Sequence, residues 1–414
     1  MSLIKHSSWN IIGAVIPTLI AVPTLGIMAR KMGVENFGLF TLLFALVGYA
    51  SIFDVGISRA VTRMISIHKN DKKLSNNILS TSSWSIFIFS LIGMLLLFQL
   101  SPNITQWLNV SERLYDDTVY SIKIMSFSIP IFLLTQVWLG YLEGLELFAI
   151  INKQRIFTSS LMSILPLISL YIDDTLSSAI FGLLIARLIT LITVYLITIR
   201  NSTFLFKNFD VNILKNLLTF GGWLTASNII SPIMVYFDRF ILSNISGASV
   251  VAQYTAPSDL VGRLGVIPAS IAKALFPKLT LNNDSYKQGV ILLGISSIIT
   301  IIPLFIFANE LLTIWLGNQY TGLPATVLQI LLVGFFFNAI AQAPFAAIQA
   351  KGAAKTTAYV HLLEVIPYLA ILYVFINFWG VIGVALAWTL RVIVDSLILF
   401  FIFNIRYKLP IEEA

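Results

Sequence analysis

Residues 217–245 read LLTFGGWLTASNIISPIMVYFDRFILSNI, an almost unbroken apolar run that carries one acidic and one basic side chain, Asp238 and Arg239. A helix needs about 20 apolar residues to cross the hydrocarbon core of a bilayer, so this run is long enough to span a membrane. An ionisable side chain in hydrocarbon costs at least about 2.5 to 3.5 kcal/mol. The run therefore predicts a membrane helix whose two charges either hold the fold together or face a polar cargo.

The composition of the whole chain supports a membrane protein. Of the 414 residues, 57% are hydrophobic and 11% are charged, and the mean hydropathy is +0.89. These values exclude a soluble globular protein. Cysteine is absent and the three histidines, His6, His68 and His361, are widely separated in the sequence. Thiolate chemistry is therefore excluded, a histidine-rich metal site is not indicated, and we expect neither a metal nor a cofactor.

Apolar runs separated by short polar turns predict an all-α protein of twelve transmembrane helices. Their approximate ranges are 9–29, 37–66, 82–99, 118–142, 156–172, 177–199, 216–245, 250–279, 288–308, 323–349, 356–377 and 380–405. Most lysines and arginines fall in the turns on one side, so the positive-inside rule predicts that both termini are cytoplasmic. These lysines and arginines, which would face anionic lipid headgroups, account for the net charge of +7. No nucleic acid partner is expected.

The two halves of the chain resemble each other. The stretch MGVENFGLFTLL from Met32 aligns with SGASVVAQYTAP from Ser246, which pairs Gly33 with Gly247. Six helices per half is an even number, so both halves would enter the membrane from the same side. We therefore predict two six-helix lobes, residues 1–206 and 207–414, related by a pseudo-two-fold axis along the membrane normal, as in transporters that rock around a central site.

Several ionisable residues fall well inside the predicted helices, where they need a partner or a wet cavity. They are Asp54, Arg59, Arg187, Asp259, Arg263, Glu364, Arg391 and Asp395. Asp259 with Arg263, and Arg391 with Asp395, are spaced i, i+4 and can neutralise each other on one helix face. For these pairs, self-neutralisation and a cavity role both remain open.

Other charges lack such a local partner. Asp238 and Arg239 are consecutive, so their side chains diverge and each should find a partner on another helix. Arg59 and Arg187 have no evident counter-ion, and an always-charged guanidinium facing water can grip a phosphate group in two places. The third, fifth and ninth predicted helices carry no internal charge, so we assign them to lipid contact.

Prolines inside the predicted helices favour kinks, because each removes a backbone hydrogen bond. They include Pro17 and Pro23 in the first helix, Pro232 in the seventh and Pro268 in the eighth. The first and seventh helices correspond in the repeat. Paired breaks of this kind are suited to hinges in alternating access, although static kinks are the simpler reading.

The sequence around the opening stretch resembles a known family. Its markers are FGGWLTASNIISPIMVYFDRFILSNISGASVVAQYTAPSDL from Phe220, IAKALFPKLT from Ile271 and FDVGISRAVTR from Phe53. Over its whole length the chain resembles the polysaccharide-type flippases, the O-antigen and teichuronic-acid Wzx group of the multidrug/oligosaccharidyl-lipid/polysaccharide exporter (MOP) superfamily. The resemblance implies a V-shaped, MATE-like bundle that flips undecaprenyl-pyrophosphate-linked oligosaccharide for lipopolysaccharide assembly, from the cytoplasmic to the periplasmic leaflet of the bacterial inner membrane.

The resemblance also implies a cationic cavity lined chiefly by the first, second, seventh and eighth helices. Arg59, Arg239 and Arg263 would then contact the pyrophosphate and acidic sugars, with Arg187 and Arg391 as further cavity candidates. Coupling or charge pairing would fall to the acidic residues Asp54, Asp238, Asp259, Glu364 and Asp395. The driving force would be a proton or a sodium gradient, and the residues do not choose between them. A monomer that works with a polymerase and other polysaccharide assembly proteins is expected.

Three alternative functions would require a different cargo or a catalytic site. A drug exporter or a lipid II flippase of the same fold would handle a different cargo, and a drug exporter would favour carboxylates over arginines in its cavity. A membrane-embedded polymerase or sugar transferase would need a substantial outer loop with catalytic residues. The outer loops are short and contain no Gly-rich phosphate loop, nucleophile elbow or metal-ligand spacing, so we expect a transporter rather than an enzyme.

Overall fold

The computed structural model describes residues 3–202, 206, 208–279 and 283–407, with their side chains except those of 3–16, 222–235, 274, 276–279, 283–285, 354 and 407. These residues form helices and short connections, with no β-strand among them, and the predicted all-α class is confirmed. The long helices are α1 (Leu3–Tyr49), α2 (Ile57–His68), α3 (Lys72–Gln99), α5 (Tyr115–Ser126), α6 (Ser128–Gly144), α7 (Phe148–Leu170), α8 (Leu176–Asn201), α9 (Val211–Ser246), α10 (Val251–Leu264), α11 (Val266–Leu279), α12 (Asn283–Ile306), α14 (Leu323–Ala350) and α15 (Ala354–Ile402). The short ones are α4 (Ser101–Trp107), α13 (Ala308–Leu316), η1 (Ala50–Asp54), η2 (Glu112–Leu114), η3 (Ala248–Val250), η4 (Asn318–Tyr320) and η5 (Phe403–Tyr407).

Seven helical stretches of the described chain are long and apolar enough to cross a membrane. They are Pro17–Asp54, Lys72–Gln99, Glu112–Gly144, Leu176–Asn201, Tyr286–Ile306, Leu323–Ala350 and Lys355–Arg406. The stretch in α12 has a mean hydropathy of 2.5 and only 17% of it is buried in the protein. Its exposed isoleucines suit the lipid contact predicted for the ninth helix, whereas the count of twelve transmembrane helices stays a prediction.

Three predicted helices are interrupted. The predicted fourth helix, 118–142, divides at Phe127 into α5 and α6. The prediction of one continuous second helix over residues 37–66 was wrong. The short helix η1 and a left-handed turn at Val55 (φ 47°) and Gly56 (φ 71°) separate α1 from α2. The backbone of this turn packs directly on α9, where a Cβ atom on Gly221 would lie 2.6 Å from the Val55 carbonyl oxygen. The eighth helix, 250–279, divides at Gly265 into α10 and α11.

Matching features occur in the two halves of the chain. Gly33 (φ 75°, ψ 171°) and Gly247 (φ 90°, ψ 154°) share a backbone conformation that is essentially restricted to glycine. A short helix follows the third predicted transmembrane helix of each half: α4 follows α3 in the first half, and α13 follows α12 in the second. These similarities agree with the pairing of Gly33 with Gly247 in the sequence.

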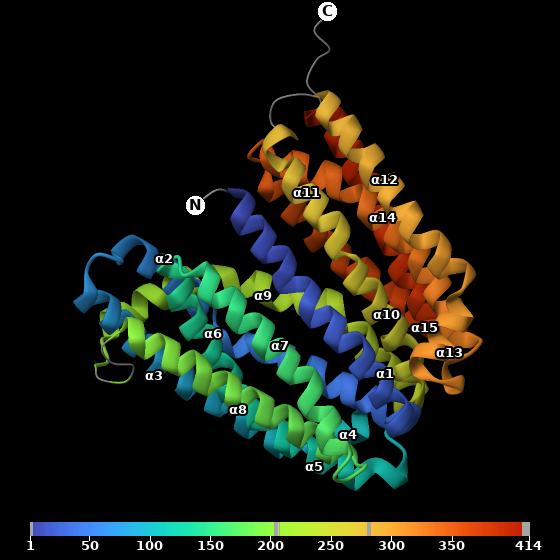
Figure 1. The fold of residues 1–414 in the computed structure, drawn as a ribbon, viewed down its shortest axis with the longest axis horizontal. Helices are drawn as coiled ribbons and strands as arrows, with labels where there is room; N and C mark the ends of the chain where they lie inside the picture. The colour runs from blue at the N-terminus through green and yellow to red at the C-terminus, as the bar shows by residue number, and fades with distance from the viewer. Residues whose placement is uncertain (1–2, 203–205, 207, 280–282, 408–414) are drawn as a thin grey trace, which may run out of the picture. The chain divides into compact units, whose positions relative to one another are not determined.

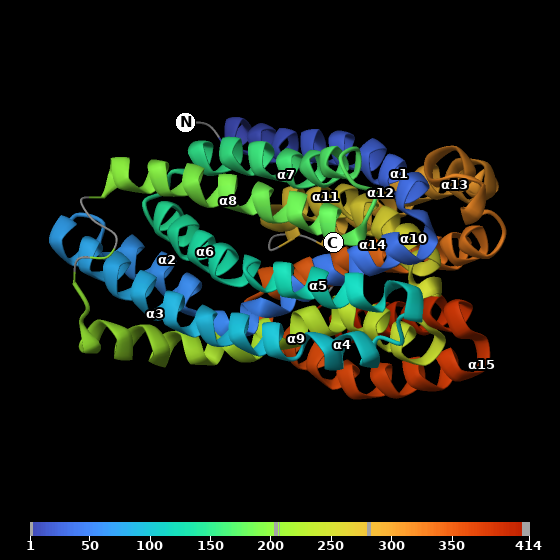
Figure 2. The same cartoon turned by 90° about the horizontal axis from the view of Figure 1, so that it is seen from below.

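The chain divides into two compact units, Met1–Phe240 and Ile241–Ala414. In the first unit α6 packs against α2, α3 and α8, and α7 lies beside both α1 and α8 (Figures 1 and 2). In the second unit α14 packs against α10, α11, α12 and α15. Each unit is thus organised around one central helix. The predicted lobe boundary between residues 206 and 207 lies before α9, whereas the division falls within α9, and that boundary stays a prediction.

Hydroxyl groups on α3 hold the segment that leads into α9. Ser80 Oγ accepts a hydrogen bond from the backbone N–H of Asn208 at 2.9 Å, and Thr81 Oγ1 accepts one from Asp210 at 3.1 Å. On the same helix, Ser83 Oγ accepts a 3.0 Å hydrogen bond from Trp138 Nε1 of α6. The described part of this segment is therefore anchored to the first unit.

The prolines lie at different kinds of position. Pro17 and Pro23 are inside α1. Pro268 lies in the first turn of α11, three residues after Gly265. The break in the predicted eighth helix therefore lies before Pro268 and not at it. Pro232 lies outside the described side chains. The hinge role of all four residues stays a prediction.

Two glycines, one helical turn apart on α6, let α2 approach closely. A Cβ atom on Gly140 would lie 2.7 Å from the Ser58 carbonyl oxygen, and one on Gly144 would lie 2.8 Å from the Thr62 carbonyl oxygen. Small residues at this spacing allow helix backbones to come together in membranes. The contact fixes the position of α2 against the core of the first unit.

We expect Gly140→Ala to lower the thermal unfolding temperature of the detergent-solubilised protein, because the added methyl group has no room against the α2 backbone. Overpacking of this kind costs about 1 to 3 kcal/mol. Gly294→Ala on α12 is the control, since its Cβ atom would lie 3.9 Å from Ile340 Cγ2, an ordinary contact. Equal unfolding temperatures for the two variants would show that α2 and α6 are not closely packed.

Candidate functional site

A cavity of about 590 Å³ lies within the first unit. Its walls come from α1, α2, α6, α7 and α8, with Tyr236 of α9. Cavities of this size are typical of small-molecule binding sites. Besides four charged residues, its polar lining comprises Ser58, Thr62, Thr135, Gln136, Asn152, Gln154, Thr158, Ser159, Thr190 and Tyr236.

The charged lining is predominantly cationic. Arg59 of α2, Arg155 of α7 and Arg187 of α8 face the cavity together with one acidic residue, Glu143 of α6, which leaves a formal net charge of +2. In the described part of the chain, none of these guanidinium groups lies within the 4.0 Å of a carboxylate that defines an ion pair. Arg187 is 5% exposed, and its guanidinium carbon lies 5.4 Å from the ring centroid of Phe132. The arrangement is suited to an anionic ligand.

Asp54 sets the position of the first turn of α2. Its Oδ1 atom accepts hydrogen bonds from the Ser58 backbone N–H at 3.2 Å and from the Ser58 hydroxyl at 2.7 Å. A carboxylate at this point satisfies a helix N–H that otherwise lacks a partner. Asp54 thus holds Ser58 and Arg59 where α2 meets the cavity. Its predicted role in coupling stays untested.

The uncharged lining can both accept and donate hydrogen bonds. Four threonine hydroxyls donate to the carbonyl oxygen four residues earlier in their own helices: Thr62, Thr135, Thr158 and Thr190. Each hydroxyl oxygen keeps lone pairs that can accept from a ligand. Gln154 Nε2 is buried and donates to no described group. This surface can therefore exchange hydrogen bonds with a ligand rich in hydroxyl groups.

The two charges of the opening stretch lie at the end of the first unit. Asp238 and Arg239 are 3% and 6% exposed, and Asp238 Oδ1 accepts the backbone N–H of Arg239 at 2.8 Å. The Arg239 guanidinium carbon lies 5.4 Å from the ring centroid of Tyr236, which lines the cavity. Arg239 thus lies behind the described cavity lining rather than within it.

The remaining predicted site residues belong to the second unit. Arg263 lies in the last turn of α10, on the same helix as Asp259. On α15, Arg391 Nε lies 3.5 Å from Glu364 Oε2, and a second pair, described below, involves Asp395. A kink at Gly380 divides α15, and these pairs join its two parts. The i, i+4 spacing had left a pairing of Arg391 with Asp395 open, and the ion pairs in the structure are with Glu364 and His361 instead.

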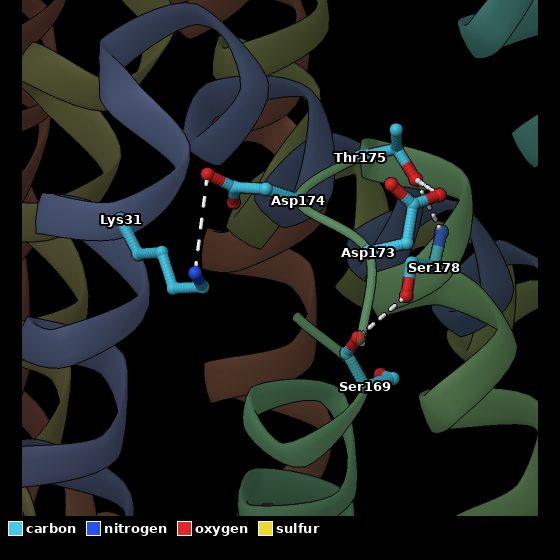
Figure 3. Close-up of polar contacts among 6 residues, drawn as sticks. All are labelled: Lys31, Ser169, Asp173, Asp174, Thr175 and Ser178. Carbon is cyan, nitrogen blue, oxygen red and sulfur yellow. Dashed lines mark hydrogen bonds and ion pairs between the residues drawn. The ribbon is translucent and has the colours of Figure 1, made fainter. Parts of the chain in front are cut away.

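The acidic residues around Asp117 and Asp174 have structural partners. Lys31 Nζ of α1 lies 4.0 Å from Asp174 Oδ2, and the Thr175 hydroxyl caps α8 by accepting the Ser178 backbone N–H at 3.2 Å (Figure 3). Asp117, at the start of α5, accepts the first backbone N–H groups of α8 at 3.0 and 3.3 Å. These carboxylates tie α1 and α5 to the start of α8.

Sequence reasoning missed the contribution of α7. It placed residues 152–155 in a loop and assigned the fifth helix to lipid, whereas α7 begins at Phe148 and brings Arg155 to the cavity wall. The assignment of this helix to lipid contact alone was wrong. Asn152, Arg155 and Ser159 are spaced i, i+3 and i+7, a polar stripe at helical period that indicates one face of a helix.

Residues 3–282 match the family model described as polysaccharide biosynthesis protein, which covers more than half of the chain. The chain belongs to this family. It is 44% identical to the "Putative O-antigen transporter" of Shigella flexneri over 96% of this chain and 97% of the relative. It is 22% identical to the lipopolysaccharide biosynthesis protein WzxC of Escherichia coli K12, over 96% of this chain and 80% of the relative.

Solved structures share the fold of this family member. The inward closed conformation of the lipid II flippase MurJ superposes with a TM-score of 0.76 at 15% identity, over 97% of this chain and 87% of that protein. An inward-facing multidrug resistance MATE family transporter of the MOP superfamily gives a TM-score of 0.75 at 16% identity, over 95% of this chain and 98% of that protein. The family resemblance predicted from the sequence is confirmed.

We expect Arg187→Met and Arg391→Met to affect stability in opposite ways. Arg187 has no ion-pair partner among the described residues, so an apolar side chain of similar length should leave the unfolding temperature unchanged or raise it. Arg391→Met leaves the buried Glu364 without its partner and should cost about 3 to 5 kcal/mol. Thermal unfolding in detergent compares the two variants. A larger loss for Arg187→Met would mean that its guanidinium is structural.

Proposed function

We propose that this protein is a flippase that moves undecaprenyl-pyrophosphate-linked oligosaccharide repeat units from the cytoplasmic to the periplasmic leaflet of the bacterial inner membrane by alternating access. The observation that carries the proposal is the set of three guanidinium groups in the cavity of the first unit, which have no ion-pair partner among the described residues. The O-antigen transport named for the Shigella relative supports the same cargo class. We expect no enzymatic step.

The cavity chemistry fits the two polar parts of such a cargo. A pyrophosphate is a compact, multiply charged anion, and guanidinium groups bind phosphate oxygens through paired N–H donors. Arg59, Arg155 and Arg187 would hold this group. Water in the cavity and the bound anion would together stabilise the guanidinium groups, which have no carboxylate partner among the described residues. The threonine hydroxyls and the amide of Gln154 would exchange hydrogen bonds with sugar hydroxyls.

The other predicted arginines take different places in this proposal. Arg239 would support the cavity through its contact with the Tyr236 ring. Arg263 and Arg391 remain candidates for binding acidic sugars from the second unit. We further propose that twelve helices form two six-helix lobes related by a pseudo-two-fold axis, with both termini cytoplasmic. One chain would suffice for transport, with a polymerase and other assembly proteins as partners.

The charge of the cavity separates this proposal from its nearest alternative. A site for organic cations would place carboxylates toward its ligand, whereas the described lining has three arginines and one glutamate. Such an exporter is therefore disfavoured. A lipid II flippase handles a pyrophosphate cargo as well, so only the glycan separates it from the proposed function.

We expect Arg59→Gln, Arg155→Gln and Arg187→Gln each to weaken binding of a short-chain polyprenyl pyrophosphate by about 10-fold or more, since a charge-assisted hydrogen bond contributes about 1.5 to 3 kcal/mol. The matched lysine variants keep the charge but lose the paired donors, and should bind with intermediate affinity. Calorimetric titration of the purified protein measures binding. Surface glycan in cells that carry each variant should fall in the same order.

Arg113→Gln is the control, because Arg113 lies in the exposed turn η2 outside the cavity. It should bind and export as the wild type does. Wild-type affinity in all three cavity variants would remove the pyrophosphate assignment. Normal surface glycan with accumulation of lipid II in cells that lack the protein would instead assign it to the lipid II pathway.

A further inference from the structure

Four ionisable side chains meet in the second unit, and none of them belongs to the lining of the cavity described above. His361 and Glu364 come from the part of α15 before the kink at Gly380, and Arg391 and Asp395 come from the part after it. His361 Nε2 lies 3.6 Å from Asp395 Oδ1, and Arg391 Nε lies 3.5 Å from Glu364 Oε2. We refer to these four residues as the α15 tetrad.

The carboxylates of the tetrad are buried and poorly satisfied. Glu364 and Asp395 are 9% and 8% exposed. Their contacts to the two cations are long, at 3.5 Å from Glu364 Oε2 to Arg391 Nε and 3.6 Å from Asp395 Oδ1 to His361 Nε2, and neither has the geometry of a good hydrogen bond in the described structure. An uncompensated buried charge of this kind is costly.

The charges of the tetrad do not balance without a proton. Two carboxylates and one guanidinium leave a net charge of −1 when the imidazole is neutral. One proton, on the imidazole or on either carboxylate, makes the cluster neutral. Because the four groups interact, this proton belongs to the cluster rather than to one residue. Burial in an apolar bundle favours the neutral state.

We propose that the α15 tetrad is a binding site for one exchangeable proton, and that its protonation is coupled to the movement of the second unit during transport. The coupling rests on the proposed function, whereas proton binding does not. His361 provides the exchange route, because its side chain is 37% exposed while that of Glu364 is 9% exposed. His361 lies two turns from the start of α15, about 10 Å along the helix axis.

Aromatic rings and a few charged side chains surround the tetrad. The ring of Phe345 on α14 stacks on His361 with centroids 5.6 Å apart, and the Arg391 guanidinium carbon lies 5.4 Å from the Tyr368 ring centroid. Charged side chains on the elements packed against α15 are Asp259, Arg263, Lys351 and Arg406. The ion pairs described for the tetrad are the two within it.

The test counts protons on the purified protein without any cargo. A jump from about pH 5 to about pH 8 in weak buffer should release about one proton fewer from Glu364→Gln than from the wild type, because that variant is already neutral. Asp395→Asn removes the other carboxylate and should give the same deficit, so a folding defect in either variant leaves the second. Arg391→Gln removes the positive charge of the tetrad, so its net charge without a proton becomes −2, and this variant should release about one proton more than the wild type.

Glu310→Gln on α13 is the control, since it removes an exposed carboxylate outside the tetrad and should leave the count unchanged. Equal counts in the wild type, Glu364→Gln and Arg391→Gln would overturn the proton site. Sodium is separated by repeating the jump in sodium and in choline chloride. Release of the proton by sodium at constant pH would also overturn the proposal, because the site would then hold a metal cation.

The coupling is tested separately with surface glycan. Glu364→Gln should lose most export while binding polyprenyl pyrophosphate with wild-type affinity, because the cavity arginines are intact. Normal export despite the loss of the proton would overturn the coupling and leave the proposed function standing. Failure of the wild type to bind the pyrophosphate lipid would instead overturn the proposed function, whatever the proton count.

Discussion

Arg59, Arg155 and Arg187, whose guanidinium groups have no carboxylate partner among the described residues, impose the main constraint on the first unit. An arginine stays charged under all ordinary conditions, so it cannot escape a poor environment by losing its proton. Arg187 is nearly buried and rests against the face of Phe132, which offers only part of the stabilisation that water would give. The cavity beside it, shared with Arg59 and Arg155, supplies the open polar surface that the charge requires. The same surface is what an anionic ligand needs.

Close helix packing keeps these charges in place. Gly140 and Gly144 let α2 lie against α6, and Asp54 fixes the first turn of α2 after the break at Gly56. The break matters because it lets the chain turn between α1 and α2 while Arg59 stays at the cavity wall. The second unit solves a similar problem differently, since its buried arginine has a carboxylate partner in Glu364. One unit thus exposes positive charge to a cavity and the other pairs it internally.

The sequence was sufficient for the helical class and for two of the three cavity arginines, because apolar length and the lack of a nearby counter-ion are local properties. The family was predicted from its motifs. Arg59 and Arg187 were identified as phosphate-binding candidates on that basis. Arg155 was missed because NKQR reads as a polar turn, although α7 begins before it. The tetrad was only partly foreseen, since the pairs His361–Asp395 and Glu364–Arg391 depend on how α15 changes direction.

The interruption of the second predicted helix shows a similar limit. Gly56 packs against Gly221, a contact between distant segments that no local pattern encodes. The glycine pair Gly140 and Gly144 was readable as a small-residue motif, but only the structure shows that its partner is α2. Local chemistry was therefore predictable where it depended on one helix, and unpredictable where it depended on which helices meet.

The most direct test of the account is an experimental structure of the protein bound to a polyprenyl-pyrophosphate oligosaccharide in a lipid nanodisc. The account predicts the diphosphate inside the cavity of the first unit, with phosphate oxygens within hydrogen-bond distance of Arg59, Arg155 and Arg187. A diphosphate bound elsewhere, with these three side chains contacting only protein or lipid, would contradict it.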